Sequence, residues 1–347
     1  MSVIGAAAAA FDRAMVQAAR LANRRKSRAE RLSHDERMRA LAAIRDAYGA
    51  PAIWDGPDAF FVPPEPIHPA LERVRAAPGG ATVFDATWPS RFEPYLAELR
   101  NRYLAYEENR TAHARLFLGP TPRPAIVLVH GYLAGQWSVE ERAWPIRWLG
   151  ERYDLAIAVL PFHAVRGDKD RRGAPPFPGP DPRVTNEGFR QAMFDLRALV
   201  RFLRARGAPS VGVMGMSLGG YTTALLATVE HGLAFATPII PLASLADFAL
   251  EQGRLGSGEE ARAEHDALEE ANRVVSPLAR PSLVPGDRVL VVAAASDRIT
   301  PPSHADRLAR HFDARVVRFE GGHLLQFGRA EAFRAVGRWL TTFVDAT

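Results

Sequence analysis

Six short, nearly continuous apolar runs follow one another along the chain from residue 125 onward. They are AIVLV (125–129), LAIAVL (155–160), VGVMG (211–215), AFATPII (234–240), VLVVAAA (289–295) and the more mixed RVVRF (315–319). Runs of this length are typical of strands buried on both faces, as in a parallel sheet covered by helices. Two earlier segments, ATVFDATW (81–88) and TAHARLFLG (111–119), alternate in part and predict two further strands.

Apolar positions at helical spacing separate these predicted strands. Residues 187–206 carry such a stripe, a short helix is expected between Ser217 and Gly232, and residues 333–343 carry the last stripe. Strands and helices that alternate in this way predict an α/β domain, doubly wound around a mostly parallel sheet of about eight strands. We assign residues 81–347 to this domain.

Two segments of this domain are too long to be simple connections. Residues 161–186 follow a predicted strand and contain six prolines, and residues 245–284 are rich in Glu, Ala, Arg and Leu. Both follow the carboxyl ends of strands, where ligands bind in open α/β sheets. We expect residues 245–284 to be an inserted pair of helices that forms a small lid, and both segments to border a pocket.

The first 80 residues predict a helical extension followed by a connector. Residues 1–48 contain two helical patterns, and the second begins with a capping box formed by Ser33 and Glu36. Residues 49–80 contain seven prolines and predict an extended connector. The apolar side chains expected along one side of the first helix are Ile4, Phe11, Met15 and Leu21. We expect the extension to pack on the main domain; the alternative is that the basic first helix binds a membrane surface or a partner.

Composition narrows the range of functions. Apolar residues make up 47% of the 347 positions and charged residues 24%, which is ordinary for a globular protein. No apolar run is long enough to span a bilayer, and the N-terminus has no positive region before its apolar stretch, so we expect a cytoplasmic protein. The absence of cysteine excludes disulfides, cysteine nucleophiles and thiolate metal sites. The net charge of +5 comes with no nucleic-acid-binding module, and we expect no nucleic-acid partner.

The segment Gly215-Met216-Ser217-Leu218-Gly219 matches the pattern G-x-S-x-G. It lies directly after a buried strand and directly before a helix, where this pattern forms a tight turn that presents a nucleophilic serine. The helix that follows favours negative charge developing at its N-terminus. Ser217 is therefore the candidate nucleophile.

An acid and a histidine follow Ser217 in the order that this chemistry requires. Asp297 lies just beyond the strand-like run 289–295, and His323 just beyond the run 315–319. Because parallel strands end at one edge of the sheet, we expect Ser217, Asp297 and His323 to meet there, with His323 as general base and Asp297 as the acid that orients it. Asp247 is an alternative acid, although its segment predicts the start of the inserted helices.

The segment His130-Gly131-Tyr132 follows the strand-like run 125–129. The glycine is expected to let the chain turn so that the backbone N–H of Tyr132 or Leu133 faces Ser217. Together with the N–H of Leu218, it would form an oxyanion hole. We expect His130 to be a structural hydrogen-bonding residue rather than a second base.

Basic side chains occur in the segment 161–186. His163 and Arg166 lie closest to the strand end and are the candidate substrate-binding residues, because a guanidinium binds carboxylate or phosphate groups with two hydrogen bonds. Lys169, Arg171 and Arg172 fit a solvated loop equally well. The chain has no H-E-x-x-H motif, no dense His/Asp cluster and no glycine-rich phosphate loop, so we expect neither a metal nor a cofactor.

Residues 81–347 resemble the α/β-hydrolase superfamily through VLVHGY, GMSLGG, ASDRITPP and GGHLLQF. The resemblance implies the α/β-hydrolase fold and a Ser217–His323–Asp297 triad that attacks an acyl carbon. The segment LPFHAVRG is loosely similar to a dienelactone-hydrolase or lipid-deacylase branch. We therefore expect a carboxylic-ester hydrolase that acts on a small-molecule ester or a lipid. The alternatives are a lipid deacylase or peptidase with the same triad, and a catalytically silent binding protein of this fold.

Overall fold

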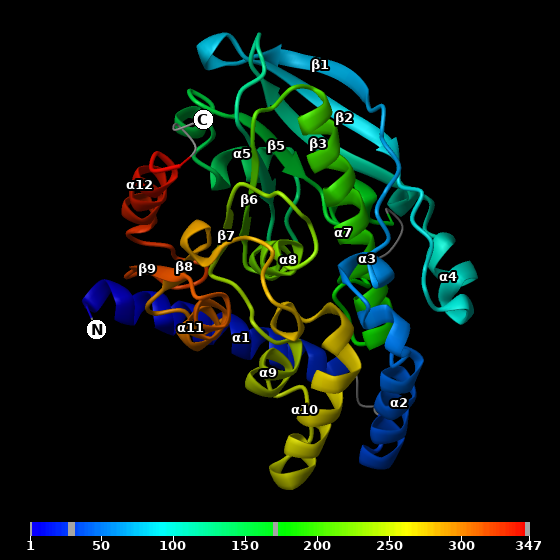
Figure 1. The fold of residues 1–347 in the computed structure, drawn as a ribbon. Helices are drawn as coiled ribbons and strands as arrows, with labels where there is room; N and C mark the ends of the chain where they lie inside the picture. The colour runs from blue at the N-terminus through cyan, green and yellow to red at the C-terminus, as the bar shows by residue number, and fades with distance from the viewer. Residues whose placement is uncertain (1, 27–31, 169–172, 344–347) are drawn as a thin grey trace.

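Nine strands form one sheet in the computed structural model, which describes residues 2–26, 32–168 and 173–343. Their order is β1-β2-β3-β5-β4-β6-β7-β8-β9 (Figure 1). The strands are β1 (Ala70–Ala76), β2 (Thr82–Pro89), β3 (Thr111–Leu118), β4 (Ala125–Val129), β5 (Asp154–Ala158), β6 (Val211–Met216), β7 (Ala236–Ile239), β8 (Leu290–Ala294) and β9 (Arg315–Phe319). The pairs between β5 and β9 in this order are parallel, and those that join β1, β2, β3 and β5 are antiparallel. The predicted mostly parallel α/β sheet is confirmed.

The strand that the sequence did not predict is β1. It lies in the segment that was expected to be an extended connector. All seven of its residues are exposed, so no hydrophobic pattern marked it as a strand. It is held by antiparallel pairing to β2 at the edge of the sheet. The assignment of residues 1–80 to a separate extension stays a prediction, although its last part is hydrogen-bonded into the sheet.

Helices cover both faces of the sheet. They are α1 (Val3–Lys26), α2 (His34–Ala47), α3 (Pro57–Phe60), α4 (Arg100–Leu104), α5 (Trp137–Ala143), α6 (Ile146–Leu149), α7 (Pro182–Ala205), α8 (Leu218–Ala227), α9 (Leu245–Glu251), α10 (Gly258–Asn272), α11 (Pro302–Phe312) and α12 (Arg329–Leu340). Successive residues of β4 face opposite sides: Val127 packs in the core with α7, α8 and α11, whereas Ile126 and Leu128 pack in the core with α12. Burial on both sides explains the continuous apolar runs of the sequence.

The two N-terminal helices are present, and the capping box at Ser33 and Glu36 is formed. The large apolar side chains of α1 do not face the domain. The exposed fractions of the large side chains Ile4, Phe11 and Met15 are 51%, 43% and 47%, whereas Ala8 and Ala9 are fully buried. The side chain of Leu21 lies outside the described residues. Small residues face the domain because they let the helix backbone approach it closely.

The predicted pair of inserted helices is α9 and α10. Helix α10 lies beside α2 of the N-terminal extension (Figure 1). Arg37 and His34 on α2 pair with Glu264 on α10, with His34 Nδ1 3.0 Å from the Glu264 Oε1 atom. Whether α9 and α10 act as a lid stays a prediction. Among the described helices, none combines the length and the apolar character needed to cross a bilayer.

Candidate active site

Ser217 occupies the sharp turn between β6 and α8. Its backbone has φ 55° and ψ −114°, a strained conformation for a residue with a side chain. The two flanking glycines are required by close packing: a Cβ on Gly215 would lie 2.1 Å from the carbonyl oxygen of Gly219, and a Cβ on Gly219 would lie 2.1 Å from that of Val129. The chain therefore needs both glycines to bring the serine above the sheet.

The structure brings Ser217, His323 and Asp297 together. The Nε2 atom of His323 lies 2.9 Å from Ser217 Oγ, and its Nδ1 atom lies 2.7 Å from Asp297 Oδ2. Because a carboxylate only accepts hydrogen bonds, Nδ1 donates to Asp297, which leaves the lone pair of Nε2 for the serine proton. His323 is 8% exposed and Asp297 1% exposed, so little water competes for these hydrogen bonds.

The carboxylate of Asp297 is fixed by further hydrogen bonds that the sequence did not point to. Its Oδ1 atom accepts from the backbone N–H groups of Ile299 and Thr300, each at 2.8 Å. The hydroxyl of Thr300 lies 3.0 Å from Asp297 Oδ2 and 3.0 Å from His323 Nδ1. Aspartate side chains often bind backbone N–H groups two or three residues further on, as in a turn. The short spacing between Asp297 and Thr300 could therefore have predicted these hydrogen bonds.

Besides Asp297, a second acidic residue touches this site, and it was not among the predicted residues. Asp12 on α1 is completely buried, and its carboxylate accepts a hydrogen bond of 2.8 Å from the backbone N–H of His323. No local pattern in the sequence links residue 12 to residue 323.

The segment 131–135 begins beside Ser217. A Cβ on Gly131 would lie 3.6 Å from the Cβ of Ser217, an ordinary contact, so that position does not need glycine for space. The left-handed backbone conformations instead occur at Leu133, with φ 61°, and at Gly135, with φ 102°. The expectation that Gly131 supplies the turn is therefore corrected to these two positions.

The N–H groups proposed for the oxyanion hole are available for a substrate. Those of Tyr132 and Leu133 donate to no acceptor among the described residues. Leu218 is the first residue of α8, where a backbone N–H has no partner within the helix. Leu218 directly follows Ser217, and a Cβ on Gly131, the residue before Tyr132, would lie 3.6 Å from the Cβ of Ser217. The oxyanion hole itself remains a proposal.

Two buried histidines support the segment 131–135. His130 donates from Nδ1 to the carbonyl of Gly131 at 2.7 Å, and its Nε2 accepts from the N–H of Leu160 at 2.9 Å. His163 donates from Nδ1 to the carbonyl of Pro161 at 2.9 Å, and its ring centroid lies 5.8 Å from that of Tyr132. Burial lowers the pKa of His130 to about 3 and that of His163 to about 4, so both rings are neutral at pH 7. His163 is thus a buried residue, with an exposed fraction of 2%, whose ring contacts that of Tyr132.

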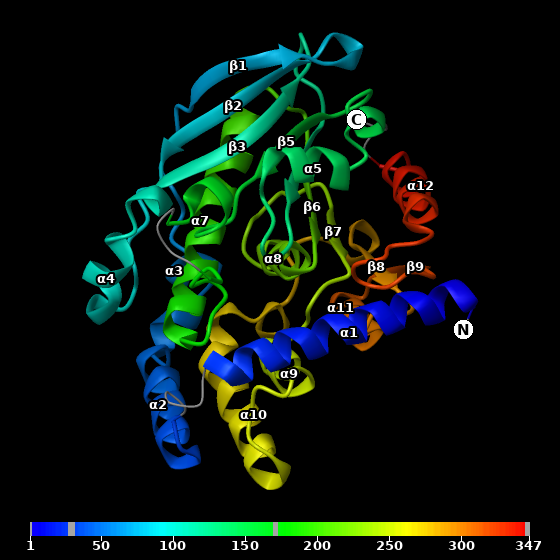
Figure 2. The same cartoon turned by 180° about the vertical axis from the view of Figure 1, so that it is seen from behind.

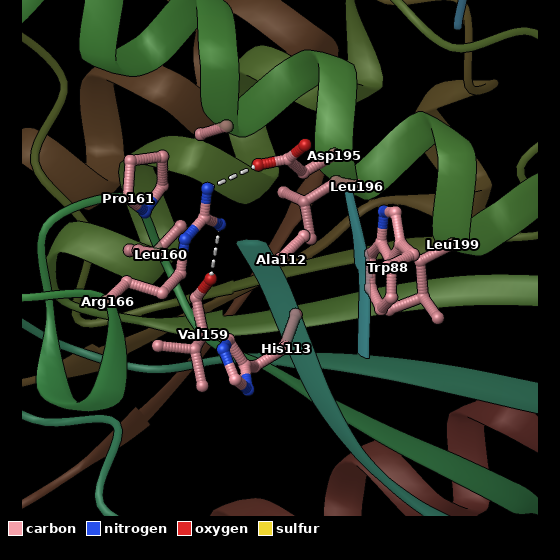
Figure 3. A pocket seen from close by; sticks show the side chains of 12 residues that line it. Trp88, Ala112, His113, Val159, Leu160, Pro161, Arg166, Asp195, Leu196 and Leu199 are labelled. Carbon is pink, nitrogen blue, oxygen red and sulfur yellow. Dashed lines mark hydrogen bonds and ion pairs between the residues drawn. The ribbon is translucent and has the colours of Figure 1, made fainter. Parts of the chain in front are cut away.

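Arg166 does not reach the substrate side of the site. Its side chain is fully buried, and its guanidinium pairs with Asp195 on α7 at 2.7 Å. Figure 3 shows this guanidinium pointing to Asp195 and to the carbonyl of Val159, at 3.0 Å from that oxygen. The candidate assignment of Arg166 to substrate binding is corrected: its charge is neutralised inside the protein, where it joins the segment after β5 to α7.

Asp247 lies on α9 and pairs with His265 at 2.8 Å, not with His323. Lys169, Arg171 and Arg172 lie outside the described residues. Within the described ranges, no group of three or more histidine, aspartate and glutamate side chains is arranged to hold a metal ion.

Comparisons with known proteins place the chain in a family. No protein-family model matches it. The uncharacterized protein MT2702 of Mycobacterium tuberculosis (strain CDC 1551 / Oshkosh) is 32% identical over 303 residues, which cover 85% of this chain and 71% of MT2702.

Two solved structures share the fold. The acetyl xylan esterase from Paenibacillus sp. R4 superposes with a TM-score of 0.60 at 15% identity, over 87% of this chain and 99% of that one. Acetyl xylan esterase 1 from Thermoanaerobacterium sp. JW/SL YS485 does so with a TM-score of 0.52 at 15% identity, over 87% and 92% of the two chains. The chain therefore has the fold of these esterases, and it belongs to the family that contains MT2702.

Proposed function

We propose that this protein is a serine hydrolase that cleaves a carboxylic ester through an acyl-enzyme. The observation that carries the proposal is the unbroken hydrogen-bond chain from Ser217 Oγ through His323 to Asp297, with lengths of 2.9 and 2.7 Å. Nucleophile, base and orienting acid within hydrogen-bond reach are the geometric signature of nucleophilic catalysis.

The proposed reaction has two halves. Ser217 Oγ attacks the acyl carbon while its proton passes to His323 Nε2, and the resulting imidazolium is stabilised by Asp297. The tetrahedral intermediate then collapses, the C–O bond to the leaving group breaks, and the alcohol leaves with the proton from His323. A water molecule then gives a proton to the same nitrogen and attacks the acyl carbon. The bond between that carbon and Ser217 Oγ breaks, the carboxylic acid leaves, and the proton returns from His323 to Oγ.

Negative charge on the former carbonyl oxygen would be held by the N–H groups of Leu218 and of Tyr132 or Leu133. One donor of this kind contributes about 3–4 kcal/mol to transition-state stabilisation. The positive end of α8 adds to the favourable potential at the same place.

The proposal is tested first with a fluorophosphonate probe. The wild-type protein should be labelled and Ser217→Ala should not, while Asp247→Asn, whose carboxylate faces His265, should be labelled at the wild-type rate. If the folded wild-type protein is not labelled and hydrolyses no p-nitrophenyl ester of any acyl length, the protein is a catalytically silent binding protein. Peptide p-nitroanilides in the same assay separate a peptidase from an esterase.

A lipid ester is the second candidate substrate, and apolar side chains on the surface favour it. Leu324, directly after His323, is 46% exposed; Phe327 is 48% exposed, and Leu133, two residues after Gly131, is 61% exposed. Helix α1 exposes Phe11 and Met15 as well. If the lipid version holds, the protein co-sediments with anionic liposomes and the double variant Phe11→Ser/Met15→Ser does not. Identical behaviour of both proteins would remove this candidate.

The expected cytoplasmic location stays a prediction.

A further inference from the structure

Helix α1 crosses the side of the molecule on which β8, β9 and α11 lie, as both Figure 1 and Figure 2 show. Its described side chains make few contacts: Ala8, Ala9 and Asp12 are completely buried, while most others are exposed. Close to its start, the Ser2 hydroxyl lies 3.1 Å from Glu320 Oε2 at the end of β9. The helix is therefore attached mainly to the chain that surrounds His323.

The carboxylate of Asp12 joins two parts of the candidate active site. Its Oδ2 atom accepts from the backbone N–H of His323 at 2.8 Å and from that of Arg298 at 3.2 Å. Its Oδ1 atom accepts from the N–H of Leu324 at 3.2 Å. Arg298 directly follows Asp297, so one side chain holds both the turn that carries the histidine and the turn that carries the acid.

The neighbouring residues are shaped for this contact. A Cβ on Gly322 would lie 2.6 Å from Asp12 Oδ2 and 3.2 Å from the Cβ of Ala8. Glycine at position 322 and alanine at position 8 therefore allow the helix and the histidine turn to approach each other. A carboxylate is also the only common side-chain group that offers acceptors alone to three converging N–H groups.

We propose that Asp12 is a positioning residue of this hydrolase: from the N-terminal helix it fixes the backbone of His323, and thereby the imidazole, relative to Ser217. The inference rests on the function proposed above and adds α1 to the machinery of the site. Asp12 touches no reacting atom, so its removal should affect the rate of the chemical step and leave substrate binding in place.

The first test compares Asp12→Asn with wild type in steady-state ester hydrolysis. Asparagine keeps one acceptor oxygen but turns an NH2 group toward the converging N–H donors. We expect kcat to fall about 10- to 100-fold, because misplacement of a catalytic group by about 1 Å has an effect of this size, while KM changes less than about twofold. Asp46→Asn on α2, whose carboxylate is 67% exposed, is the matched control and should leave both constants unchanged.

Gly322→Ala perturbs the same contact from the other side and should lower kcat in the same way. Hydrogen exchange then separates positioning from a general loss of stability. The amides of His323 and Leu324 should be protected in wild type and lose protection selectively in Asp12→Asn, while amides of β6 keep theirs.

The possible outcomes are distinct. An active wild type with an Asp12→Asn variant of unchanged kcat would overturn the inference and leave the proposed function intact. Fast exchange of the His323 amide in wild type would overturn it as well, even if the variants fail to fold. A wild type inert toward the probe and all esters would instead sink the proposed function.

Discussion

Replacement of Asp195 by asparagine tests whether the guanidinium of Arg166 stabilises the fold or binds substrate. The exposed fraction of the Arg166 side chain is 0% and that of Asp195 is 7%, and their atoms are 2.7 Å apart. Asp195 also accepts a hydrogen bond of 2.7 Å from the hydroxyl of Ser90, which asparagine can keep. The substitution therefore changes little in shape and leaves one positive charge buried without its counter-charge.

The expected size of the effect follows from that burial. Removal of one partner from a buried ion pair lowers the free energy of unfolding by about 3–5 kcal/mol. With an unfolding entropy of about 2.1 cal/mol/K per residue, a chain of 347 residues loses about 4–7 °C in Tm. The double variant Arg166→Met/Asp195→Leu should be more stable than Asp195→Asn, because no charge is then left buried.

Urea unfolding and ester hydrolysis, both at 25 °C, provide the measurements. Asp195→Asn should unfold at lower urea concentration, while its KM stays within about twofold of the wild-type value. Glu98→Gln, which removes an ion pair with the partly exposed Arg183, is the control and should leave the unfolding curve in place. An Asp195→Asn protein of wild-type stability with a strongly raised KM would refute the structural role and restore Arg166 to the substrate site.

Three further predictions concern the active site and its support. Asp297→Asn should lower kcat by a factor on the order of 10⁴ through loss of the correct histidine tautomer, and a steady-state assay in which this variant stays active would contradict that role. Gly219→Ala should abolish probe labelling and lower Tm because the new Cβ meets a strand carbonyl at 2.1 Å, whereas Gly131→Ala, with only ordinary contacts at 3.6 Å, should be tolerated. Burial lowers the pKa of His163 to about 4, below its unfolded value of about 6.5. Below pH 6.5 the unfolded chain binds a proton that the folded ring does not, so the free energy of unfolding falls as the pH falls from 6.5 toward 4. The difference in unfolding free energy between wild type and His163→Asn should therefore shrink by about 2 kcal/mol from pH 7.5 to pH 5, and a constant difference in urea titrations would contradict the buried neutral ring.

The sheet was predictable wherever burial leaves a pattern. Every strand from β2 to β9 was expected from its apolar run or its alternation, because side chains buried on one or both faces are mostly apolar. Strand β1 was missed for the same reason: all seven of its residues are exposed, and only backbone hydrogen bonds to β2 make it a strand. Helical spacing does not tell which side of a helix meets the domain: Phe11 and Met15 of α1 are exposed, whereas Ala8 is buried.

The candidate site also divides into residues that the sequence predicts and residues whose place depends on packing. Ser217 and Asp297 each follow a buried strand, and His323 follows the edge strand β9. The parallel sheet alone therefore predicts that the three meet at one edge. Arg166 also follows a strand, but its direction depends on the position of Asp195 on α7, which no local pattern records. Asp12 depends on a contact between distant parts of the chain, and such contacts are set by packing rather than by sequence spacing.

The long separation in sequence between Asp12 and His323 has a consequence for biosynthesis. Asp12 and His323 are 311 positions apart, and closing so long a loop costs chain entropy that only a formed core can offset. We expect the histidine turn to dock on α1 after the central strands have assembled. During translation, the serine turn and the N-terminal helix leave the ribosome long before residue 323 is made. A nascent chain of this protein therefore carries the proposed nucleophile Ser217 without the proposed base, and we expect it to stay inert toward acyl groups until residue 323 has been added and its turn has docked.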